Sequence, residues 1–564
     1  MEGAPIVPTV SSEASFNLSA VFETVARAVP DQEVLVWRDL RLTYHEMNTR
    51  IDGAAHYLVE RGLGCHTERA DLPGHLSGQD HLGIYLRNGN EYLEAMVAGF
   101  RARVAPFNVN YRYVEEELLH LLEDAQTKAL VFHAEFAPQV ASIRDRLPDL
   151  AVLIQVADES GNDLLPGAVD YESILDTSVP SDGMPVPTGD DLFILYTGGT
   201  TGMPKGVLWR HDDVFITSMG GTPYGTSEPM TTYDEIAESA LNGKGSVSIL
   251  MVPPFMHGAA QWSTFHMITL GGKVVILDNV QHFDPADALT VAIREKVVSI
   301  PVVGDAVARP LLDEIRRGDY DLSGLAAINN GSAPLTPGLR AQLLDALPHI
   351  VVTDVAGASE TGLQMSTMSM KGMESDTATF TPVATTTVVD EQFTRSLEAG
   401  EGTGWLAQRG RVPIGYLGDP DKTARTFPVI DGVRYSIPGD RAEILPDGRI
   451  LLLGRDSVTI NSGGEKIFVE EVERAIAAHP DVRDVVVVGR PSERWGSEPV
   501  AVVQVAAGSN VSDDELLAEC GRHVARYKVP KAIVRCAQVE RSPSGKADYR
   551  WAQAQAQASG AGTA

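Results

Sequence analysis

The stretch that decides the fold is Tyr196-Thr-Gly-Gly-Thr-Thr-Gly-Met-Pro-Lys-Gly-Val207, which follows the apolar run Leu192-Phe-Ile-Leu195. Such a run is typical of a buried strand. The three glycines allow a tight turn that brings backbone N–H groups close to an anion. Two threonines add hydroxyl donors, and Lys205 adds a mobile positive charge. The stretch therefore predicts a strand followed by a loop that holds a triphosphate.

This loop is not a Walker loop, because the spacing Gly-x-x-x-x-Gly-Lys-Ser/Thr is absent. Pro204 stands directly before Lys205 and disfavours a helix through that point. A glycine- and threonine-rich loop with a lysine is often only a surface turn. The phosphate-binding interpretation therefore depends on the rest of the chain.

Length and composition limit the class of protein. The chain has 564 residues, which favours a large core with a smaller appended unit, and its net charge of −30 disfavours non-specific binding to nucleic acid or anionic membranes. Its three cysteines lack metal or redox spacing, which indicates a reducing compartment. The amino terminus has no basic region and no long apolar run. We therefore expect no signal peptide, no membrane span and a cytoplasmic protein.

Strand-like and helix-like segments alternate along much of the chain, which predicts an α/β fold with a largely parallel sheet. Residues 220–246 are polar and are expected to form a long surface excursion, and the tail from Ala552 is expected to fray. From Gly402 the pattern changes to short antiparallel strands, with a hairpin at Pro446-Asp-Gly448. The expected parallel strands include Val34–Trp37, His81–Leu86, Val104–Asn110, Lys128–Phe132, Val152–Val156, Ser248–Val252, Lys273–Leu277 and Val297–Val303. The stretches Ala326–Leu335 and Val351–Gly362 are each expected to be a strand that runs into a turn of small residues.

Several polar residues follow expected strands, where ligands bind in parallel-sheet folds. Glu360 follows small residues and is suited to Mg²⁺, which takes one or two carboxylates together with water and phosphate oxygens. His257 follows a Pro-Pro corner, and Asp440 follows Pro-Gly and suits a ribose diol. Lys546 lies on a glycine turn. Each has an ordinary alternative: a helix cap, a histidine bonded within its own loop, a turn residue or a solvated surface charge.

Seven motifs occur in a fixed order, and together they resemble the adenylate-forming superfamily of acyl-CoA synthetases, adenylation domains and luciferases. Within it the chain is most similar to actinobacterial sterol side-chain or fatty acyl-CoA ligases, through segments such as Asn108-Val-Asn-Tyr-Arg-Tyr113 and Lys546-Ala-Asp-Tyr-Arg-Trp551. The seven motifs are Tyr196–Val207, Pro254–Gly258, Gly331–Leu335, Gly357–Gly362, Tyr435–Asp440, Gly454–Glu473 and Pro543–Tyr549.

The resemblance implies a large N-terminal domain over residues 1–456, with parallel-type sheets flanked by helices and a small β-barrel-like part. A small, mobile α+β C-terminal domain is expected over residues 457–564. It also implies an ATP-dependent acid-thiol ligase that uses Mg²⁺ and CoA. A carboxylate attacks the α-phosphate of ATP to give acyl-AMP and pyrophosphate, and the CoA thiol then displaces AMP.

The same resemblance assigns roles to individual residues. Glu360 is expected to contact Mg²⁺, Asp440 the ribose with Arg455 nearby, and His257 the acyl carbonyl. Lys546 bridges the substrate carboxylate and the phosphate, and then swings out while Gly463 and Gly464 approach the pantetheine channel. The expected nucleotide-binding residues are Thr197, Gly198, Gly199, Thr200, Thr201, Gly202 and Lys205 for the pyrophosphate portion, with Thr200 counted as catalytic, Gly331, Ser332 and Ala333 for adenine, and Ser359 beside Glu360.

Three departures from the family pattern stand out. Gly198 replaces the usual serine, Ala356 replaces an aromatic residue near adenine, and Ser457 stands at the hinge in place of aspartate or lysine. The substrate choice stays open. Small residues such as Gly220, Gly221 and Gly258 suggest room for a bulky apolar acid, and a sterol side-chain acid and a medium- or long-chain fatty acid both fit.

Two other functions are consistent with parts of the motif pattern. An adenylating enzyme that passes acyl-AMP to a carrier protein is one, and the Gly463-Gly464 turn argues for CoA against it. An inactive ligand-binding homologue is the other, and the joint presence of Lys205, Glu360, Asp440 and Lys546 argues against it. Homo-oligomerisation cannot be read from the sequence.

Overall fold

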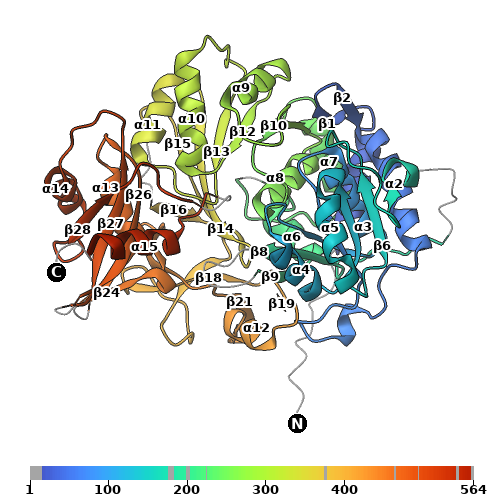
Figure 1. The fold of residues 1–564 in the computed structure, drawn as a ribbon. Helices are drawn as coiled ribbons and strands as arrows, with labels where there is room; N and C mark the ends of the chain where they lie inside the picture. The colour runs from blue at the N-terminus through green and yellow to red at the C-terminus, as the bar shows by residue number, and fades with distance from the viewer. Residues whose placement is uncertain are drawn as a thin grey trace. The chain divides into compact units, whose positions relative to one another are not determined.

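The structure is a computed structural model that describes residues 15–175, 183–197, 204–223, 225–373, 378–462, 465–492, 495–541 and 545–560. Figure 1 shows the ribbon with its helices and strands labelled. The contacts within the chain divide it into two compact units. Unit 1 comprises Met1–Pro301, Ser359–Leu363 and Arg409–Ser436, and unit 2 comprises Val302–Ala358, Gln364–Gln408 and Ile437–Ala564. The expected domain boundary after residue 456 stays a prediction.

Unit 1 contains two sheets of mainly parallel strands. In the first, the order is β2-β1-β11-β10-β12, and all pairs except the β1–β2 hairpin are parallel. β10 and β12 are buried along their whole length, as expected for strands covered on both faces. The bounds are β1 (Glu33–Trp37), β2 (Leu40–Thr43), β10 (Ser248–Met251), β11 (Lys273–Ile276) and β12 (Ser299–Val302).

The second sheet of unit 1 carries the glycine-rich loop, and its order is β19-β9-β8-β4-β3-β5-β6-β7. β8 is parallel to β4 but antiparallel to β9, and the register places Thr197 opposite Lys205. The predicted loop is therefore the connection of a hairpin. The bounds are β3 (His81–Tyr85), β4 (Ala105–Asn108), β5 (Thr127–His133), β6 (Val152–Val156), β7 (Val169–Asp170), β8 (Leu192–Thr197), β9 (Lys205–Arg210) and β19 (Gly415–Tyr416).

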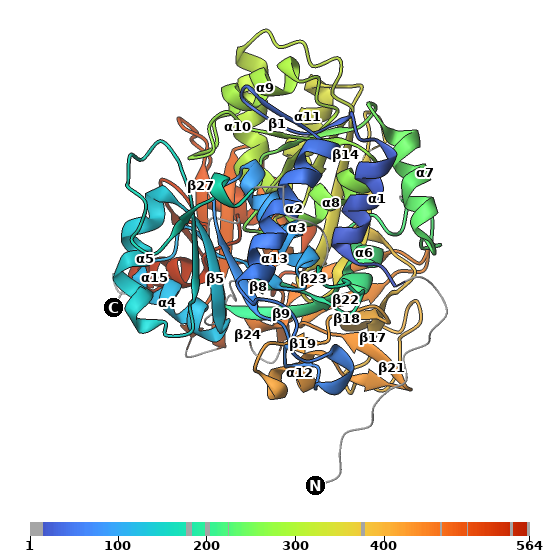
Figure 2. The same cartoon turned by 90° about the vertical axis from the view of Figure 1, so that its right-hand side faces the viewer.

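Helices of unit 1 share one core with strands of both sheets (Figure 2). α1, α2, α3, α6 and α8 supply most of its helical side chains, while α4 and α5 pack with the second sheet in a separate cluster. The bounds are α1 (Leu18–Ala28), α2 (Tyr44–Glu60), α3 (Asn90–Arg101), α4 (Glu115–Asp124), α5 (Ala137–Ile143), α6 (His211–Ser218), α7 (Tyr233–Gly243), α8 (Gly258–Thr269), α9 (Pro285–Arg294) and α12 (Pro420–Thr426), with the hairpin β20 (Val429–Ile430) and β21 (Val433–Ser436).

The expected surface excursion at residues 220–246 is wrong in part. It contains α7, whose Ile236 and Ala240 are fully buried in the core of unit 1. The signal for this helix was present, because Thr232 and Glu235 form a capping box at its start.

The first part of unit 2 begins with parallel β13 and β14 and continues as antiparallel strands in the order β13-β14-β15-β16-β23-β22-β18, with β17 on β18. The antiparallel part thus starts at β15, before Gly402, and its linear order is an open sheet where a barrel-like part was expected. The bounds are β13 (Ala327–Asn330), β14 (Val351–Ala358), β15 (Gly362–Ser369), β16 (Thr379–Pro382), β17 (Thr386–Val389), β18 (Thr403–Arg409), β22 (Asp440–Ile444), β23 (Ile450–Arg455), α10 (Gly304–Arg317) and α11 (Pro337–Ala346).

The last part of unit 2 is a three-stranded sheet, β26-β27-β28, with helices on both faces. α13 and α14 cover one face, where Cys520 is fully buried as predicted, and α15 covers the other. The bounds are β24 (Ile460–Ser462), β25 (Glu465–Ile467), α13 (Val469–Ala477), β26 (Val482–Ser492), β27 (Gly496–Val505), α14 (Asp513–His523), β28 (Ala532–Arg535) and α15 (Tyr549–Gly560). Across the described helices of both units, none is long and apolar enough to cross a membrane.

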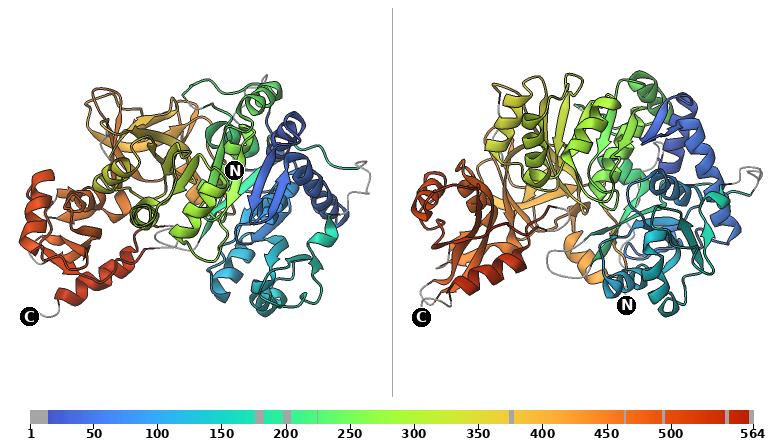
Figure 3. Two further views of the ribbon diagram at one scale, coloured as in Figure 1. Left: turned by 90° about the horizontal axis from the view of Figure 1, so that it is seen from above. Right: turned by 45° about the horizontal axis from the view of Figure 1, so that its top comes forward.

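The expected fraying of the tail from Ala552 is wrong for residues 552–560, and residues 561–564 lie outside the described part of the chain. α15, drawn in red, runs toward the C-terminal mark in both views of Figure 3. Its Ala552 and Ala556 are fully buried against valines of β26 and β27, and the Gln553 side chain donates a hydrogen bond of 2.7 Å to the Gly489 carbonyl. Alanine favours helix, and its small side chain lets the helix approach the sheet closely.

A matched pair of substitutions on α15 tests this packing. Ala556→Asp places a charge against the valines and is expected to lower the free energy of unfolding by about 2 kcal/mol or more, because the carboxylate loses its hydration. Ala554→Asp lies on the exposed side of the same helix and is expected to change it by less than about 0.5 kcal/mol. Urea unfolding measures both. Equal effects would mean that α15 does not dock.

Glu473 on α13 is a partly buried carboxyl whose Oε1 accepts a hydrogen bond of 2.8 Å from the Val487 N–H group. Burial raises its pKa above the ordinary range, the neighbouring Glu470 and Asp484 raise it further, and Arg541 opposes them. The folded chain therefore binds this proton more tightly than the unfolded chain does.

Stability should consequently fall as pH rises above the unfolded pKa of about 4.3. Glu473→Gln keeps the oxygen acceptor and removes the titration. Its free energy of unfolding relative to the wild type is expected to rise by more than about 1 kcal/mol between about pH 5 and about pH 8. Chemical denaturation across this range measures the difference, with the exposed Glu540→Gln as control. A pH-independent difference would contradict the assignment.

Candidate active site

The predicted site residues fall into two groups, one in each unit. Unit 1 holds Thr197, Lys205, His257, Ser359 and Glu360, and unit 2 holds Gly331, Ser332, Ala333, Asp440, Arg455 and Lys546. The remaining ones lie outside the described residues: Gly198, Gly199, Thr200, Thr201, Gly202, Gly463 and Gly464.

Thr197 and Lys205 face each other at the loop end of the β8–β9 hairpin. The Lys205 ammonium lies 3.7 Å from Oδ1 of Asp124, and the Tyr196 hydroxyl donates a hydrogen bond of 2.7 Å to Oδ2 of the same carboxylate. One third of the Lys205 side chain is exposed. Its charge is therefore held at the base of the predicted phosphate loop while it remains accessible to a ligand.

Glu360 is fixed through both its main chain and its side chain. The Ser436 hydroxyl donates to the Glu360 carbonyl at 2.6 Å, and the buried Tyr416 hydroxyl donates to Glu360 Oε1 at 2.8 Å. The neighbouring Ser359 carbonyl accepts a hydrogen bond of 2.8 Å from the indole of Trp209. These contacts set the direction of the carboxylate.

This carboxylate fits Mg²⁺. A carboxylate that is hydrogen-bonded through one oxygen can coordinate a cation through the other, and magnesium needs only one or two carboxylates besides water and phosphate oxygens. Among the described residues there is no group of three or more histidine, cysteine or acidic side chains able to hold a metal. Glu360 therefore suits a magnesium ion that arrives with a phosphate ligand.

His257 is the residue before α8, and the loop around it is tied to the phosphate-loop strand by Asn108. The Asn108 amide donates to the carbonyls of Met256 and Tyr196 at 2.7 and 2.9 Å, and its oxygen accepts from the Tyr196 N–H group at 2.8 Å. The family segment Asn108–Tyr113 does not predict this role for Asn108, because the contacts join residues far apart in the chain.

In unit 2 the predicted adenine loop, Gly331–Ala333, is held by Asn330. The Asn330 oxygen accepts from the Gly304 N–H group at 2.7 Å, and its amide donates to the Ala333 carbonyl at 3.0 Å. Ser332 has φ +65°, a left-handed conformation that is uncommon outside glycine. The loop is thus fixed in a strained shape by a buried side chain.

Asn330 also donates to Asp354 at 2.8 Å, and Asp354 forms an ion pair of 2.8 Å with Arg340. All three side chains are almost fully buried, and burial raises the pKa of Asp354 while Arg340 opposes this. The ion pair with Arg340 and the hydrogen bond from Asn330 thus compensate the buried Asp354 carboxylate. Neither Asn330 nor Asp354 was predicted to support the site.

Asp440 and Arg455, predicted to lie near each other, are register partners of β22 and β23, and the Arg455 guanidinium donates to Asp440 at 3.3 Å. The Arg455 N–H group donates to Glu470 at 3.3 Å. Gly454, at φ +130°, leaves no space for a side chain beside that carboxylate. The end of β23 therefore packs directly against α13.

The turn that carries Lys546 is held by Arg541, which forms an ion pair of 2.6 Å with Asp484 and donates to the Gly545 carbonyl at 3.1 Å. Gly545 has φ +74°, and a Cβ there would lie 3.5 Å from the Ala333 side chain. The structure thus brings the Lys546 turn and the predicted adenine loop of unit 2 into contact.

The interpretation of the small residues near the acyl segments needs correction. A Cβ on Gly221 would lie 2.7 Å from the Phe215 ring, one on Gly258 2.5 Å from Leu195, and one on Gly220 2.9 Å from Thr269. These distances are shorter than van der Waals contact. The glycines therefore allow close packing and do not leave room for a bulky acid.

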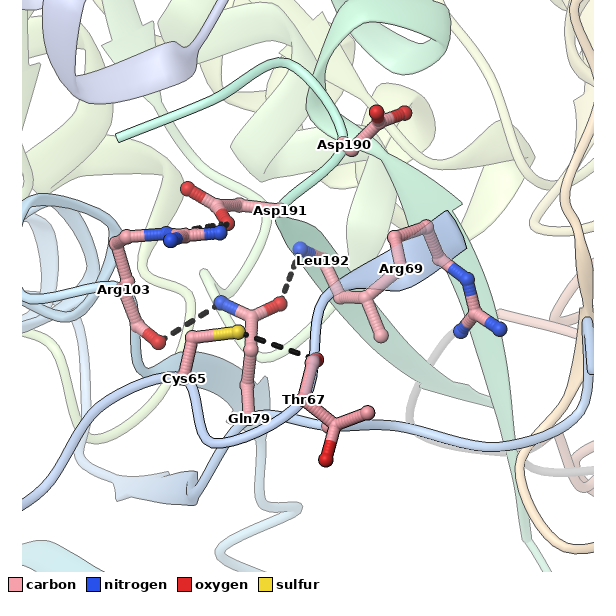
Figure 4. A pocket seen from close by; sticks show the side chains of 9 residues that line it. Cys65, Thr67, Arg69, Gln79, Arg103, Asp190, Asp191 and Leu192 are labelled. Carbon is pink, nitrogen blue, oxygen red and sulfur yellow. Dashed lines mark hydrogen bonds and ion pairs between the residues drawn. The ribbon is translucent and has the colours of Figure 1, made fainter. Parts of the chain in front are cut away.

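A cavity at the other end of β8 is lined by Arg69, Arg103 and Asp191 (Figure 4). Arg103 donates to Asp191 at 2.9 Å, and Gln79 bridges the Arg103 carbonyl and the Leu192 N–H group at 2.9 and 2.7 Å. Its volume of about 10 Å³ holds at most a single water molecule. It is a structural feature and not a substrate site.

The chain is similar to characterised proteins over almost its full length. It is 56% identical to the medium-chain acyl-CoA ligase Mig of Mycobacterium avium, over 96% of this chain and 98% of that protein. It is 38% identical to a 3-oxocholest-4-en-26-oate–CoA ligase of Rhodococcus rhodochrous, over 96% of each.

Solved structures share the fold. An anthranilate CoA ligase in complex with anthranoyl-AMP superposes with a TM-score of 0.79 at 19% identity, covering 97% of this chain and 98% of that one. A Mycobacterium tuberculosis fatty acyl CoA synthetase gives 0.68 at 22% identity, covering 96% and 99%.

Two family models match the chain in the expected order. The AMP-binding enzyme model covers residues 22–417, and the model of the AMP-binding enzyme C-terminal domain covers residues 471–546. The first match alone spans well over half of the chain. The chain therefore belongs to the AMP-binding enzyme family.

Proposed function

We propose that this protein is an ATP-dependent acyl-CoA ligase that activates a medium-chain fatty acid as acyl-AMP and transfers it to CoA. The observation that carries the proposal is the 56% identity to a medium-chain acyl-CoA ligase over nearly the whole of both chains. Because ATP and CoA are both substrates, we also propose that it works in the cytoplasm.

In the first half-reaction, an oxygen of the fatty acid attacks the α-phosphorus of ATP, and the bond to the bridging oxygen of pyrophosphate breaks. Lys205 and Thr197 hold the phosphates, and Asp440 accepts hydrogen bonds from the ribose hydroxyls. Mg²⁺ bound at Glu360 would offset negative charge on the phosphates. Lys546 stabilises the charge that develops around the α-phosphate.

In the second half-reaction, the sulfur of CoA attacks the acyl carbon, AMP leaves and the thiol proton is released. We propose that residues 457–564 move as a C-terminal domain between the two steps, which withdraws Lys546 and brings the Gly463-Gly464 turn to the CoA channel. The region matched by the C-terminal family model lies within these residues.

The packing of the chain also favours a medium-chain acid over a sterol acid, in addition to the similarity to a medium-chain acyl-CoA ligase. Gly220, Gly221 and Gly258 pack directly against neighbouring side chains, so the small residues that suggested a bulky substrate do not create space. A flexible acyl chain can occupy a narrower channel than a rigid ring system and still bury apolar area at roughly 25 cal/mol per Å².

Pyrophosphate release with a panel of acids, with and without CoA, tests the proposal. Octanoate and decanoate are expected to support CoA-dependent turnover, with kcat/KM at least about tenfold higher than for a cholestenoate-type acid. A preference for the sterol acid would overturn the substrate assignment and leave the chemistry intact. Acyl-AMP without any thioester would instead indicate transfer to a carrier protein, and no acyl-AMP at all an inactive homologue.

Lys546→Ala should separate the half-reactions. Acyl-AMP formation is expected to fall by more than about a hundredfold, because the charge near the α-phosphate is lost. Thioester formation from supplied acyl-AMP is expected to change by less than about threefold, since Lys546 acts only in the first step. Single-turnover assays of each step provide the measurement. If both steps fell equally, the assignment of two conformations would be wrong.

A further inference from the structure

One feature of unit 1 that the family motifs did not single out lies directly beside Glu360. It is the segment from β19 to α12, which carries Tyr416 and Lys422. Thr423 accepts a hydrogen bond of 2.9 Å from the Tyr416 N–H group and donates one of 2.7 Å to the Asp419 carbonyl. The Asp419 carboxylate caps α12 by accepting from the Lys422 N–H group at 2.9 Å. These contacts fix the Lys422 backbone relative to Tyr416.

The Tyr416 ring connects a cation to the Glu360 carboxylate. The Lys422 ammonium lies 3.9 Å from the centre of the ring, a cation–π geometry. The hydroxyl of the same ring donates to Glu360 Oε1 at 2.8 Å, and the ring is 2% exposed. Lys422 is therefore held near the predicted magnesium ligand by a rigid, buried side chain.

The charge of Lys422 is poorly compensated. Burial lowers its pKa, Glu360 and Asp419 raise it, and the charge of Lys205 lowers it further, which puts both cations in one electrostatic neighbourhood. Within the described part of the chain, no carboxylate lies within 4.0 Å of its ammonium. The other partly buried lysines of known partner each lie within 4.0 Å of a carboxylate. The pairs are Lys528 with Glu471 at 2.6 Å, Lys128 with Asp149 at 3.1 Å, Lys273 with Glu33 at 3.3 Å and Lys205 with Asp124 at 3.7 Å.

A partly buried cation with no carboxylate within 4.0 Å keeps most of its charge available to an anion that reaches it. MgATP and magnesium pyrophosphate retain negative charge on the phosphates after the metal has bound. We propose that Lys422 is a second cation for the polyphosphate of ATP, positioned by Tyr416 beside Glu360 and complementing Lys205. This inference rests on the proposed function for the identity of the anion, and it assigns Lys422 to the β- and γ-phosphates.

Equilibrium binding to the full chain tests the assignment without turnover. Lys422→Met keeps most of the side-chain length and removes the charge. It is expected to weaken binding of MgATP and of magnesium pyrophosphate by roughly 10- to 100-fold, as for a lost hydrogen bond to a charged group. AMP lacks these phosphates, so its affinity is expected to change by less than about twofold. Calorimetry measures all three ligands.

Controls separate a ligand contact from a structural role. Lys422→Arg should restore most of the MgATP affinity, and Lys128→Met, which removes a lysine paired with Asp149 on the surface, should leave it unchanged. The ratio of MgATP to AMP affinity within each variant does not depend on how much of the protein is folded, and Lys422→Gln supplies a second neutral variant.

Two outcomes would overturn the assignment: an unchanged MgATP affinity in the neutral variants, or an equal loss of MgATP and AMP affinity. The proposed function fails in a different way, through the absence of thioester formation by the wild type. If the wild type made no acyl-CoA but still bound MgATP through Lys422, the assignment of Lys422 would hold and the proposed function would be wrong.

Discussion

The unit 1 part of the candidate site depends on one strand, β9, and on its antiparallel pairing with β8. Lys205 is its first residue and lies opposite Thr197, so the pairing closes the phosphate loop into a hairpin. Further along β9, the Trp209 indole binds the Ser359 carbonyl. On its other edge β9 pairs with β19, which supplies Tyr416. A slip of one residue would turn every β9 side chain to the opposite face and would separate Lys205, Ser359 and Tyr416 from their partners.

In unit 2, buried polar side chains hold the backbone of the predicted adenine loop in place. Its predicted adenine loop has no hairpin to close it, and Ser332 adopts a left-handed conformation. The loop keeps this shape because the Asn330 side chain binds the Ala333 carbonyl and the Gly304 N–H group at the start of α10. Asp354 accepts a hydrogen bond from Asn330 and forms an ion pair with Arg340. Removing one member of such a network leaves the others unsatisfied in a dry environment. The network therefore fixes geometry more than it adds stability.

Much of this architecture was predictable from local patterns. The apolar runs predicted the parallel strands, and the Pro446-Asp-Gly448 turn predicted the β22–β23 hairpin. The ordered motifs indicated the family. The sequence-based expectations were wrong where a locally polar segment packs against the core in the folded chain. α15 reads as a polar alanine- and glutamine-rich tail because, beyond Trp551, its fully buried side chains are the small ones of Ala552 and Ala556. The supporting roles of Asn108, Asn330 and Tyr416 were not readable, because each joins segments far apart in the chain.

The glycines illustrate why residue type alone misleads about a substrate. A glycine next to a cavity leaves room, whereas a glycine against a ring or a leucine is required by the packing itself, and only the neighbours distinguish the two cases.

The net charge of the chain is likewise a poor guide to what a single site binds. A net charge of −30 repels polyanions at long range, yet screening confines that field to roughly 8 Å at physiological ionic strength. Within that distance, Lys205 and Lys422, held by Asp124 and by the Tyr416 ring, supply two positive charges to the local potential. An acidic protein can thus bind a small polyphosphate selectively while it rejects large polyanions.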